Sequence, residues 1–240
     1  MQPGNIQALE DLNQEVISCA RCPRLVIYRQ DVAQKKRRMY LNEEYWGRPL
    51  PGYGDPEAQL LIVGLAPAAH GGNRTGRMFT GDRSGDWLFE TLYKFGFASS
   101  PTSSHRDDGL TLRKAYITAT VHCAPPDNKP LYQERINCLP YLLRELDLLK
   151  NVSVVVALGK IAFDGYLSAR GKMGLEVPKP RPRFGHGVSC GLPGGKTLVA
   201  SYHPSQQNTQ TGRLTREMLE GVFCYVRYLV DTGVYPNILF

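Results

Sequence analysis

The sequence predicts an α/β fold with a central, mostly parallel four-stranded sheet and helices on both of its faces. Four short apolar runs rich in Val, Ile, Leu or Thr are typical of buried strands, because they lack the alternation of a sheet with one solvated face. Helical stretches lie between them, and strands that alternate with helices form parallel βαβ units. The expected strands are 59–64, 115–121, 152–158 and 197–201, and the expected helices are 6–18, 86–95, 131–149, 161–169 and 215–231.

Length and composition indicate a globular chain. Its 240 residues are 42% hydrophobic and 21% charged, and we expect one domain that spans residues 1–240. No apolar run approaches the roughly 18 residues that cross a bilayer, and the first residues lack the pattern of a secretory signal, so we expect a cytoplasmic protein. The net charge of +7 is a weak indication of a polyanionic partner.

The sequence contains six cysteines, which in a reducing compartment do not indicate disulfides. Four of them form a candidate metal site: Cys19, Cys22, Cys123 and Cys138. Four thiolates suit a tetrahedral zinc ion or a 4Fe-4S cluster, and the alternative is a chance CxxC among small buried residues. Cys224 lies on an apolar helical stripe and is expected in the core, whereas Cys190 lies in a glycine-rich turn without an evident partner.

Three irregular segments rich in Gly, Pro and His follow predicted strands. They are residues 64–73, 122–129 and 201–205. Because ligands bind at the carboxyl edge of an open parallel sheet, these three loops predict a site there. Two basic segments remain: the run 35–38 is expected to be a solvated face rather than a phosphate contact, and the Pro-rich segment 178–183 could lie along a nucleic-acid backbone or be an exposed connection.

Several of these motifs occur together in one known family. The segment GLAPAAHGGNRTGRMFTGDRSGDWL at 64–88, the four spaced cysteines and His-Pro-Ser at 203–205 resemble the uracil-DNA glycosylase superfamily. The similarity is greatest to its iron–sulfur-containing family 5, or type B. The resemblance implies a three-layer α/β/α domain that flips a damaged base out of DNA and cuts its N-glycosidic bond. It also implies a structural 4Fe-4S cluster on the four cysteines, with zinc the lesser alternative.

The resemblance also assigns roles to single residues. Phe79 would stack on the flipped base, and His203 would donate a hydrogen bond to the base oxygen on which negative charge develops. Residues expected to line the substrate pocket are Gly64, Pro67, Ala68 and His70. Short polar side chains and one arginine are expected to contact DNA phosphates: Ser205, Gln206, Asn208 and Arg213.

Two positions depart from the better-known uracil glycosylases. Those enzymes place an Asp or Asn after the first proline to position water, where this chain has Ala68 and Ala69. Asp82 is then the first candidate for positioning water, and His70 is the second. Ala119 replaces an Asn that reads the uracil edge, so we expect a broader range that includes hypoxanthine, with Asn128 a partial substitute.

The leading interpretation is a monofunctional glycosylase that acts as a monomer on DNA containing uracil or other deaminated bases. A monofunctional enzyme is preferred over one with an additional lyase step, because the three loop motifs contain no lysine that could form a Schiff base. The nearest lysine is Lys129. One alternative is a non-catalytic iron–sulfur protein that binds nucleic acid or senses redox state. Another is a nucleotide-binding enzyme that acts on free bases or nucleosides.

Overall fold

The computed structural model describes residues 3–233 as an α/β fold with one mixed sheet. Its strands are β1 (Tyr53–Gly54), β2 (Leu60–Gly64), β3 (Ala115–Ala119), β4 (Val154–Leu158), β5 (Ser189–Leu192) and β6 (Lys196–Ser201), in the spatial order β1-β3-β2-β4-β6-β5. The four predicted strands are confirmed, and they pair in parallel as the core of the sheet.

The sheet has six strands rather than the expected four. Its two further strands, β1 and β5, pair antiparallel with β3 and β6 at the edges. β1 is only two residues long, and β5 has the sequence Ser-Cys-Gly-Leu. Neither carries an apolar run that the sequence pattern could detect. Cys190 therefore lies buried in an edge strand and not in a turn.

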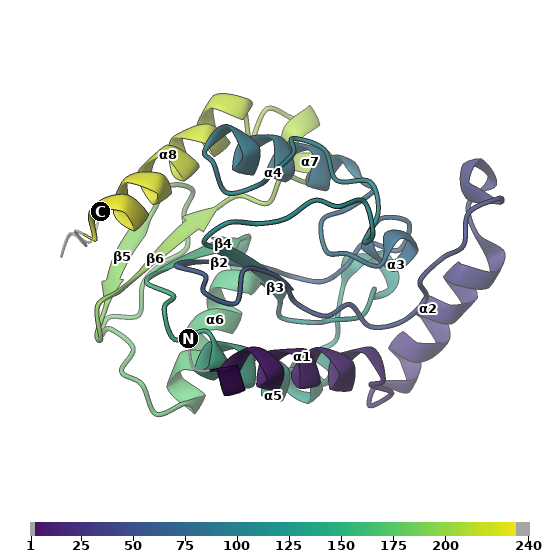
Figure 1. Ribbon diagram of the computed structural model, residues 1–240, viewed down its shortest axis with the longest axis horizontal. Helices are drawn as coiled ribbons and strands as arrows, with labels where there is room; N and C mark the ends of the chain where they lie inside the picture. The colour runs from purple at the N-terminus through teal and green to yellow at the C-terminus, as the bar shows by residue number, and fades with distance from the viewer. Residues whose placement is uncertain (1–2, 234–240) are drawn as a thin grey trace.

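Helices cover both faces of the sheet (Figure 1). They are α1 (Pro3–Ile17), α2 (Pro23–Lys35), α3 (Gly72–Thr75), α4 (Arg83–Lys94), α5 (Tyr132–Leu148), α6 (Lys160–Lys172), α7 (Gln206–Gln210) and α8 (Arg216–Thr232), with the short 3-10 helices η1 (Arg38–Tyr40) and η2 (Pro126–Asn128). α4 and α8 pack on one face, and α1, α5 and α6 pack on the other. The five expected helices are present, whereas α2 was not expected.

Alternate residues of each strand enter opposite cores. Leu60 and Ile62 of β2 pack under α4 and α8, while Leu61 and Val63 pack against the α1, α5 and α6 side. On α8, the apolar stripe that includes Leu219 is buried as predicted. Cys224, however, is exposed, because its position on the helix falls outside that stripe. Within residues 3–233, no helix is long and apolar enough to cross a membrane.

Candidate active site at the carboxyl edge of the sheet

Three loops leave the parallel strands at one edge of the sheet. Gly64, the last residue of β2, pairs with Ala119, the last residue of β3, so both strands end at the same level. β6 ends at Ser201, which is paired with Leu158 of β4. The segments that follow β2, β3 and β6 therefore begin side by side, as the sequence predicts.

Phe79 and His203 meet at this edge although 124 positions separate them. Their ring centroids lie 5.6 Å apart with an interplanar angle of 29°, which is a stacked arrangement. Phe79 has a φ of 53°, a left-handed conformation that a bulky residue rarely adopts. Its ring lies over Gly64, where an added Cβ would be only 2.9 Å from the ring carbons. Gly64 thus leaves the space that the stacked pair needs.

His203 is held in an uncharged state by its surroundings. Burial lowers the pKa of its imidazole to about 4, so the ring is neutral at pH 7. Asn208 Nδ2 donates to the backbone carbonyl of His203 at 2.9 Å. Ser205, two residues after His203, caps α7 through a hydrogen bond from Asn208 N to its Oγ at 3.4 Å. The loop that carries His203 is therefore closed by its own polar side chains.

Asp82 lies between the Phe79 segment and the loop after β2. It is the N-cap of α4, and its Oδ1 accepts a hydrogen bond from Gly85 N at 3.0 Å. Its Oδ2 lies against Gly71, where a Cβ would be 2.2 Å away. Burial raises the pKa of this carboxyl above its usual value. The expectation that Asp86 begins the helix is wrong, because the cap is four residues earlier.

His70 extends from the same loop toward Tyr45. Its Nδ1 lies 3.0 Å from Tyr45 Oη, and the two rings form an edge-on contact. Burial, followed by the positive charges of Arg37 and Arg74, lowers the pKa of His70. Its neighbour Pro67 is buried, whereas Ala68 is half-buried.

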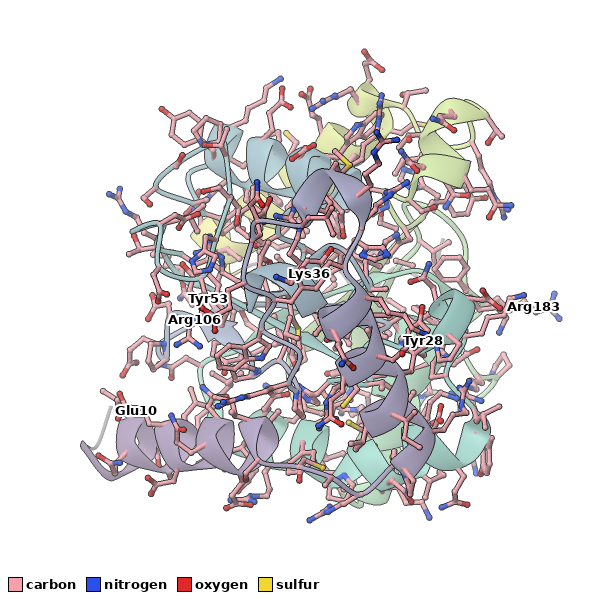
Figure 2. The ribbon with its side chains drawn as sticks, turned by 90° about the vertical axis from the view of Figure 1, so that its right-hand side faces the viewer. Glu10, Tyr28, Lys36, Tyr53, Arg106 and Arg183 are labelled. Atoms are coloured by element: carbon pink, nitrogen blue, oxygen red, sulfur yellow. The ribbon has the colours of Figure 1, made fainter. Side chains whose placement is uncertain are left out.

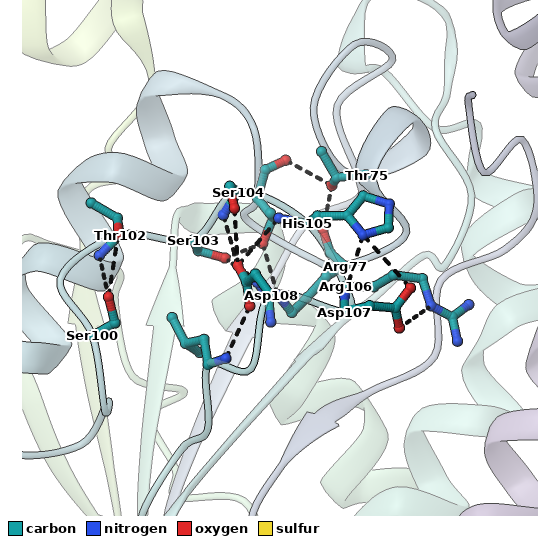
Figure 3. A network of polar contacts seen from close by, with 12 residues as sticks. Thr75, Arg77, Ser100, Thr102, Ser103, Ser104, His105, Arg106, Asp107 and Asp108 are labelled. Atoms are coloured by element: carbon teal, nitrogen blue, oxygen red, sulfur yellow. Dashed lines mark hydrogen bonds and ion pairs between the residues drawn. The ribbon is translucent and has the colours of Figure 1, made fainter. Parts of the chain in front are cut away.

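A network of polar contacts joins Arg77, in the segment that carries Phe79, to the loop that contains Ser103 and Asp108 (Figure 3). Arg77, only 2% exposed, pairs with Asp108 and donates through Nη2 to Ser103 Oγ at 2.8 Å. Its Nε donates to Thr80 Oγ1 at 3.2 Å, so the pair fixes residues on both sides of Phe79. The pKa of Asp108 is held well below its usual range, because the hydrogen bonds from Arg77 and from backbone amides outweigh the opposing effect of burial.

The four candidate cysteines line a pocket, together with Arg29, His122 and Tyr141. Donors point at three of their sulfurs: Arg29 Nη1 lies 3.0 Å from Cys123 Sγ, His122 N lies 3.3 Å from Cys138 Sγ, and Asn137 Nδ2 lies 3.5 Å from Cys22 Sγ. Burial raises the pKa of Cys123 to about 11 and also raises that of Cys138.

The donor set of this pocket fits a thiolate-bound group. Amide and guanidinium N–H groups directed at sulfur stabilise thiolates that a metal would otherwise have to stabilise alone. Within residues 3–233, no group of three or more His, Cys, Asp or Glu side chains is arranged to hold a metal ion. The four thiols nevertheless line one pocket, and a set of four thiolates suits either zinc or a 4Fe-4S cluster.

Comparison with known proteins identifies the family of this chain. The family model of the Uracil DNA glycosylase superfamily matches residues 51–227. The chain belongs to this superfamily. It is 49% identical over 221 residues to the type-5 uracil-DNA glycosylase of Mycobacterium tuberculosis, covering 92% of this chain and 81% of that protein. It is 51% identical over 205 residues to the type-5 enzyme of Thermus thermophilus, covering 85% and 90%. A type-4 uracil-DNA glycosylase of Thermotoga maritima is 26% identical over 218 residues, covering 90% and 92%.

The other predicted residues of this superfamily member are less tightly gathered. Ala119 is 2% exposed at the end of β3, beside Gly64. Asn128 lies in η2 with a φ of 55° and is exposed. Gln206 and Arg213, which follow His203 in the chain, are exposed, and the guanidinium of Arg213 lies 4.7 Å from the ring centroid of Tyr202.

Sequence reasoning missed the buried arginines that hold this edge together. Arg74 donates through Nε to the His70 carbonyl at 2.9 Å and through Nη2 to the Gly81 carbonyl at 2.9 Å. Arg77 makes the contacts with Asp108 described above. The sequence does contain one indication of them, because Arg74 and Arg77 lie three positions apart inside a glycine-rich motif. A flexible loop does not require two arginines, so their presence indicates structural contacts.

Proposed function

We propose that this chain is a monofunctional DNA glycosylase that flips uracil out of DNA and hydrolyses its N-glycosidic bond. The reaction leaves an abasic site and begins base excision repair. The observation that carries the proposal is the stacked pair of Phe79 and His203 at the carboxyl edge of the sheet. A flipped base needs an aromatic surface to stack on and a donor at its edge, and this pair offers both within one small volume.

His203 suits the donor role because it is neutral. Cleavage of the C1′–N bond places positive charge on the sugar and negative charge on the departing base. An imidazole with a pKa of about 4 donates an N–H to the base oxygen without adding a positive charge beside the developing cation. The donor is also preorganised, since its loop is closed by Asn208.

Asp82 is proposed to position the attacking water. Oδ1 is committed to the cap of α4, which fixes the side chain. Oδ2, which lies against Gly71, is the oxygen proposed to accept a proton from water. The raised pKa of Asp82 brings this carboxylate closer to the range in which a general base is most effective at neutral pH. His70 is the second candidate, although its Nδ1 is engaged by Tyr45.

Ala119 is proposed to widen the range of bases to include hypoxanthine. A methyl group at the end of β3 makes no hydrogen bond with a base edge, so no polar partner is left unpaired when a purine enters. Asn128 is exposed and lies further along the loop, so we assign it only an auxiliary role in recognising the base edge.

Contacts with the DNA backbone are assigned to the segment after His203. Because Ser205 and Asn208 are engaged in local hydrogen bonds, exposed Gln206 and Arg213 are the proposed phosphate contacts. The acting form is proposed to be a monomer, and sedimentation of the protein–DNA complex measures this.

The cysteine pocket is proposed to hold a 4Fe-4S cluster through Cys19, Cys22, Cys123 and Cys138. When bound, the cluster would tie the start of α2, the loop after β3 and the middle of α5 together, as a structural element outside the chemistry. The support is the thiol donor set with its three N–H donors. Iron and acid-labile sulfide content of protein purified without oxygen tests this assignment.

The test of the function uses end-labelled duplexes that carry one uracil or one hypoxanthine. We expect strand cleavage at either base only after hot alkali, because the enzyme leaves an intact abasic site. Cleavage without alkali would contradict the monofunctional assignment. Protein with its full iron content that releases neither base would instead support a non-catalytic binding protein. Release of uracil but not of hypoxanthine would contradict the proposal that Ala119 widens the range of bases.

A further inference from the structure

An arm formed by residues 36–46 projects beside the candidate active site. It begins where Lys36, with a φ of 56°, ends α2 and turns the chain into η1. Figure 1 shows the arm beyond the carboxyl edge of the sheet, and Figure 2, which views that side directly, places Lys36 near the middle of the face. At its tip Arg37 and Arg38 are exposed, and the large apolar side chains of Met39 and Leu41 are 68% and 55% exposed.

The arm is anchored to the active-site loops by Arg74. The guanidinium of this buried arginine lies 3.9 Å from the ring centroid of Tyr40 and pairs with Glu43, both in the arm. The same guanidinium donates to the carbonyls of His70 and Gly81, which flank the candidate pocket. One side chain therefore fixes the arm and the loops relative to each other.

The end of the arm adds further connections. Tyr45 Oη is within hydrogen-bond distance of His70 Nδ1, at 3.0 Å, and accepts from Arg37 N at 3.4 Å. The amide of Trp46 donates to the Arg74 carbonyl at 3.0 Å. Arg37 is close enough to His70 that its charge contributes to the lowered pKa of that histidine. The tip of the arm is thus adjacent to the loop after β2.

The charges at the tip are not neutralised by the protein. Lys35 pairs with Asp31 one turn earlier in α2, and Arg74 pairs with Glu43. Arg37 and Arg38 have no carboxylate within 4.0 Å among residues 3–233. Two exposed guanidiniums on consecutive residues, neither paired with a carboxylate, suit a ligand with closely spaced negative charges.

We propose that this arm is a second DNA-binding element, in which Arg37 and Arg38 bind backbone phosphates next to the flipped nucleotide and Met39 packs on the groove edge. The proposal rests on the proposed glycosylase function. It makes Arg37 and Arg38, the second half of the basic run 35–38, phosphate contacts rather than part of the solvated face that the sequence suggests. The arm would add to the phosphate contact proposed for Arg213, which follows His203 in the chain.

The test compares Arg37→Gln/Arg38→Gln with the wild type in binding to a duplex that carries one 2′-fluoro-2′-deoxyuridine, which resists hydrolysis. Affinity is measured as a function of salt. Each lost phosphate contact lowers the slope of log K against log salt by about 0.9, so we expect a slope smaller by about 2 and an affinity at least about tenfold weaker at low salt. Met39→Ala should weaken binding about fivefold with the slope unchanged, since no charge is lost.

Arg113→Gln/Lys172→Gln is the matched control, because both exposed cations lie at the opposite edge of the sheet. The proposal predicts that this control keeps the wild-type slope. It is overturned if the arm variant and the control have the same slope and affinity. Because the readout is binding to an uncleavable duplex, a failure of the arm is distinguishable from an absence of glycosylase activity, which the alkali assay measures separately on wild-type protein.

Discussion

The proposed base pocket (Gly64, Phe79, Asp82 and His203) and the cysteine pocket both adjoin the carboxyl end of β3 but are built in different ways. In the base pocket, backbone conformation positions the groups, as in the left-handed Phe79 over Gly64 and in Asp82 at the N-cap of α4. In the cysteine pocket, side chains from α2, α5 and the loop after β3 converge, and their sulfurs accept hydrogen bonds. In the proposed function the first arrangement preorganises the chemistry, whereas the second connects distant parts of the chain.

Because the two regions are built differently, we expect variants of one region to change the stability of the fold and variants of the other to change the reaction rate. A variant of the cysteine pocket should destabilise the fold, because it removes a connection between segments more than 100 positions apart. A variant of the base pocket should retain the fold and lose rate, because strand pairing and the two cores do not depend on it. Each of the following changes tests one side of this comparison.

The largest effect is expected for Cys138→Ala. Loss of a ligand should abolish iron binding and remove on the order of 5 kcal/mol of folding free energy, equivalent to about 15 °C in Tm for a chain of this size. Differential scanning fluorimetry and iron analysis measure both. Cys224→Ala is the matched control, since Cys224 is exposed. Full stability of Cys138→Ala would contradict the structural role given to the pocket.

Asp82→Asn should affect rate alone. Asn is as good an N-cap as Asp, so α4 keeps its first hydrogen bond, but an amide cannot accept a proton from water. We expect single-turnover excision of uracil to slow by about 10²–10⁴-fold with Tm nearly unchanged. Asp86→Asn, on the first turn of the same helix, should keep its rate. A rate near wild type for Asp82→Asn would shift the positioning of water to other groups, including the phosphates of the substrate.

Gly64→Ala tests the packing of the stacked pair. The added methyl would lie 2.9 Å from the Phe79 ring and must displace it from His203. A displacement of about 1 Å in a positioning group costs about 10²-fold in rate. Iron content should stay at the wild-type level, because the ring does not touch the cysteine pocket. Unchanged excision kinetics would show that the base is not held on Phe79.

The smallest effect is expected for Glu145, a buried residue of α5 whose carboxyl group contacts β3. Its Oε2 accepts from Thr118 Oγ1 at 2.6 Å, and burial raises its pKa from 4.5 to about 8. The folded protein therefore binds this proton more tightly than the unfolded chain does. The resulting stabilisation is complete below about pH 4.5 and is lost as the pH rises through 8.

Glu145→Gln removes this titration while keeping an acceptor for Thr118. Between pH 6 and 8 we expect the unfolding free energy of the wild type to fall by about 2 kcal/mol relative to the variant. Urea unfolding at several pH values measures the difference. Parallel curves for the two proteins would contradict the raised pKa.

How much the sequence predicts differs between elements. The central strands were predictable because each is a short apolar run, and the loops at their ends carry the Gly, Pro and His residues of the base pocket. Helix α2 was not predictable, because its buried face includes the charged Arg29 beside Leu25 and Val32. The charged residue interrupts the helical spacing of apolar residues in the sequence. The burial of Arg74 and Arg77 depends on Glu43 and Asp108, each 31 positions away, and no local pattern reveals such partners.

The central claim is that His203, stacked on Phe79, stabilises the departing base. Its most direct test is single-turnover excision of uracil by His203→Ala, with iron content, Tm and affinity for the uncleavable duplex measured on the same preparation. We predict a rate about 10²–10³-fold below wild type, the cost of removing one preorganised donor, with the other three quantities unchanged. A rate within about threefold of wild type, a difference below about 1 kcal/mol in barrier, would contradict the claim.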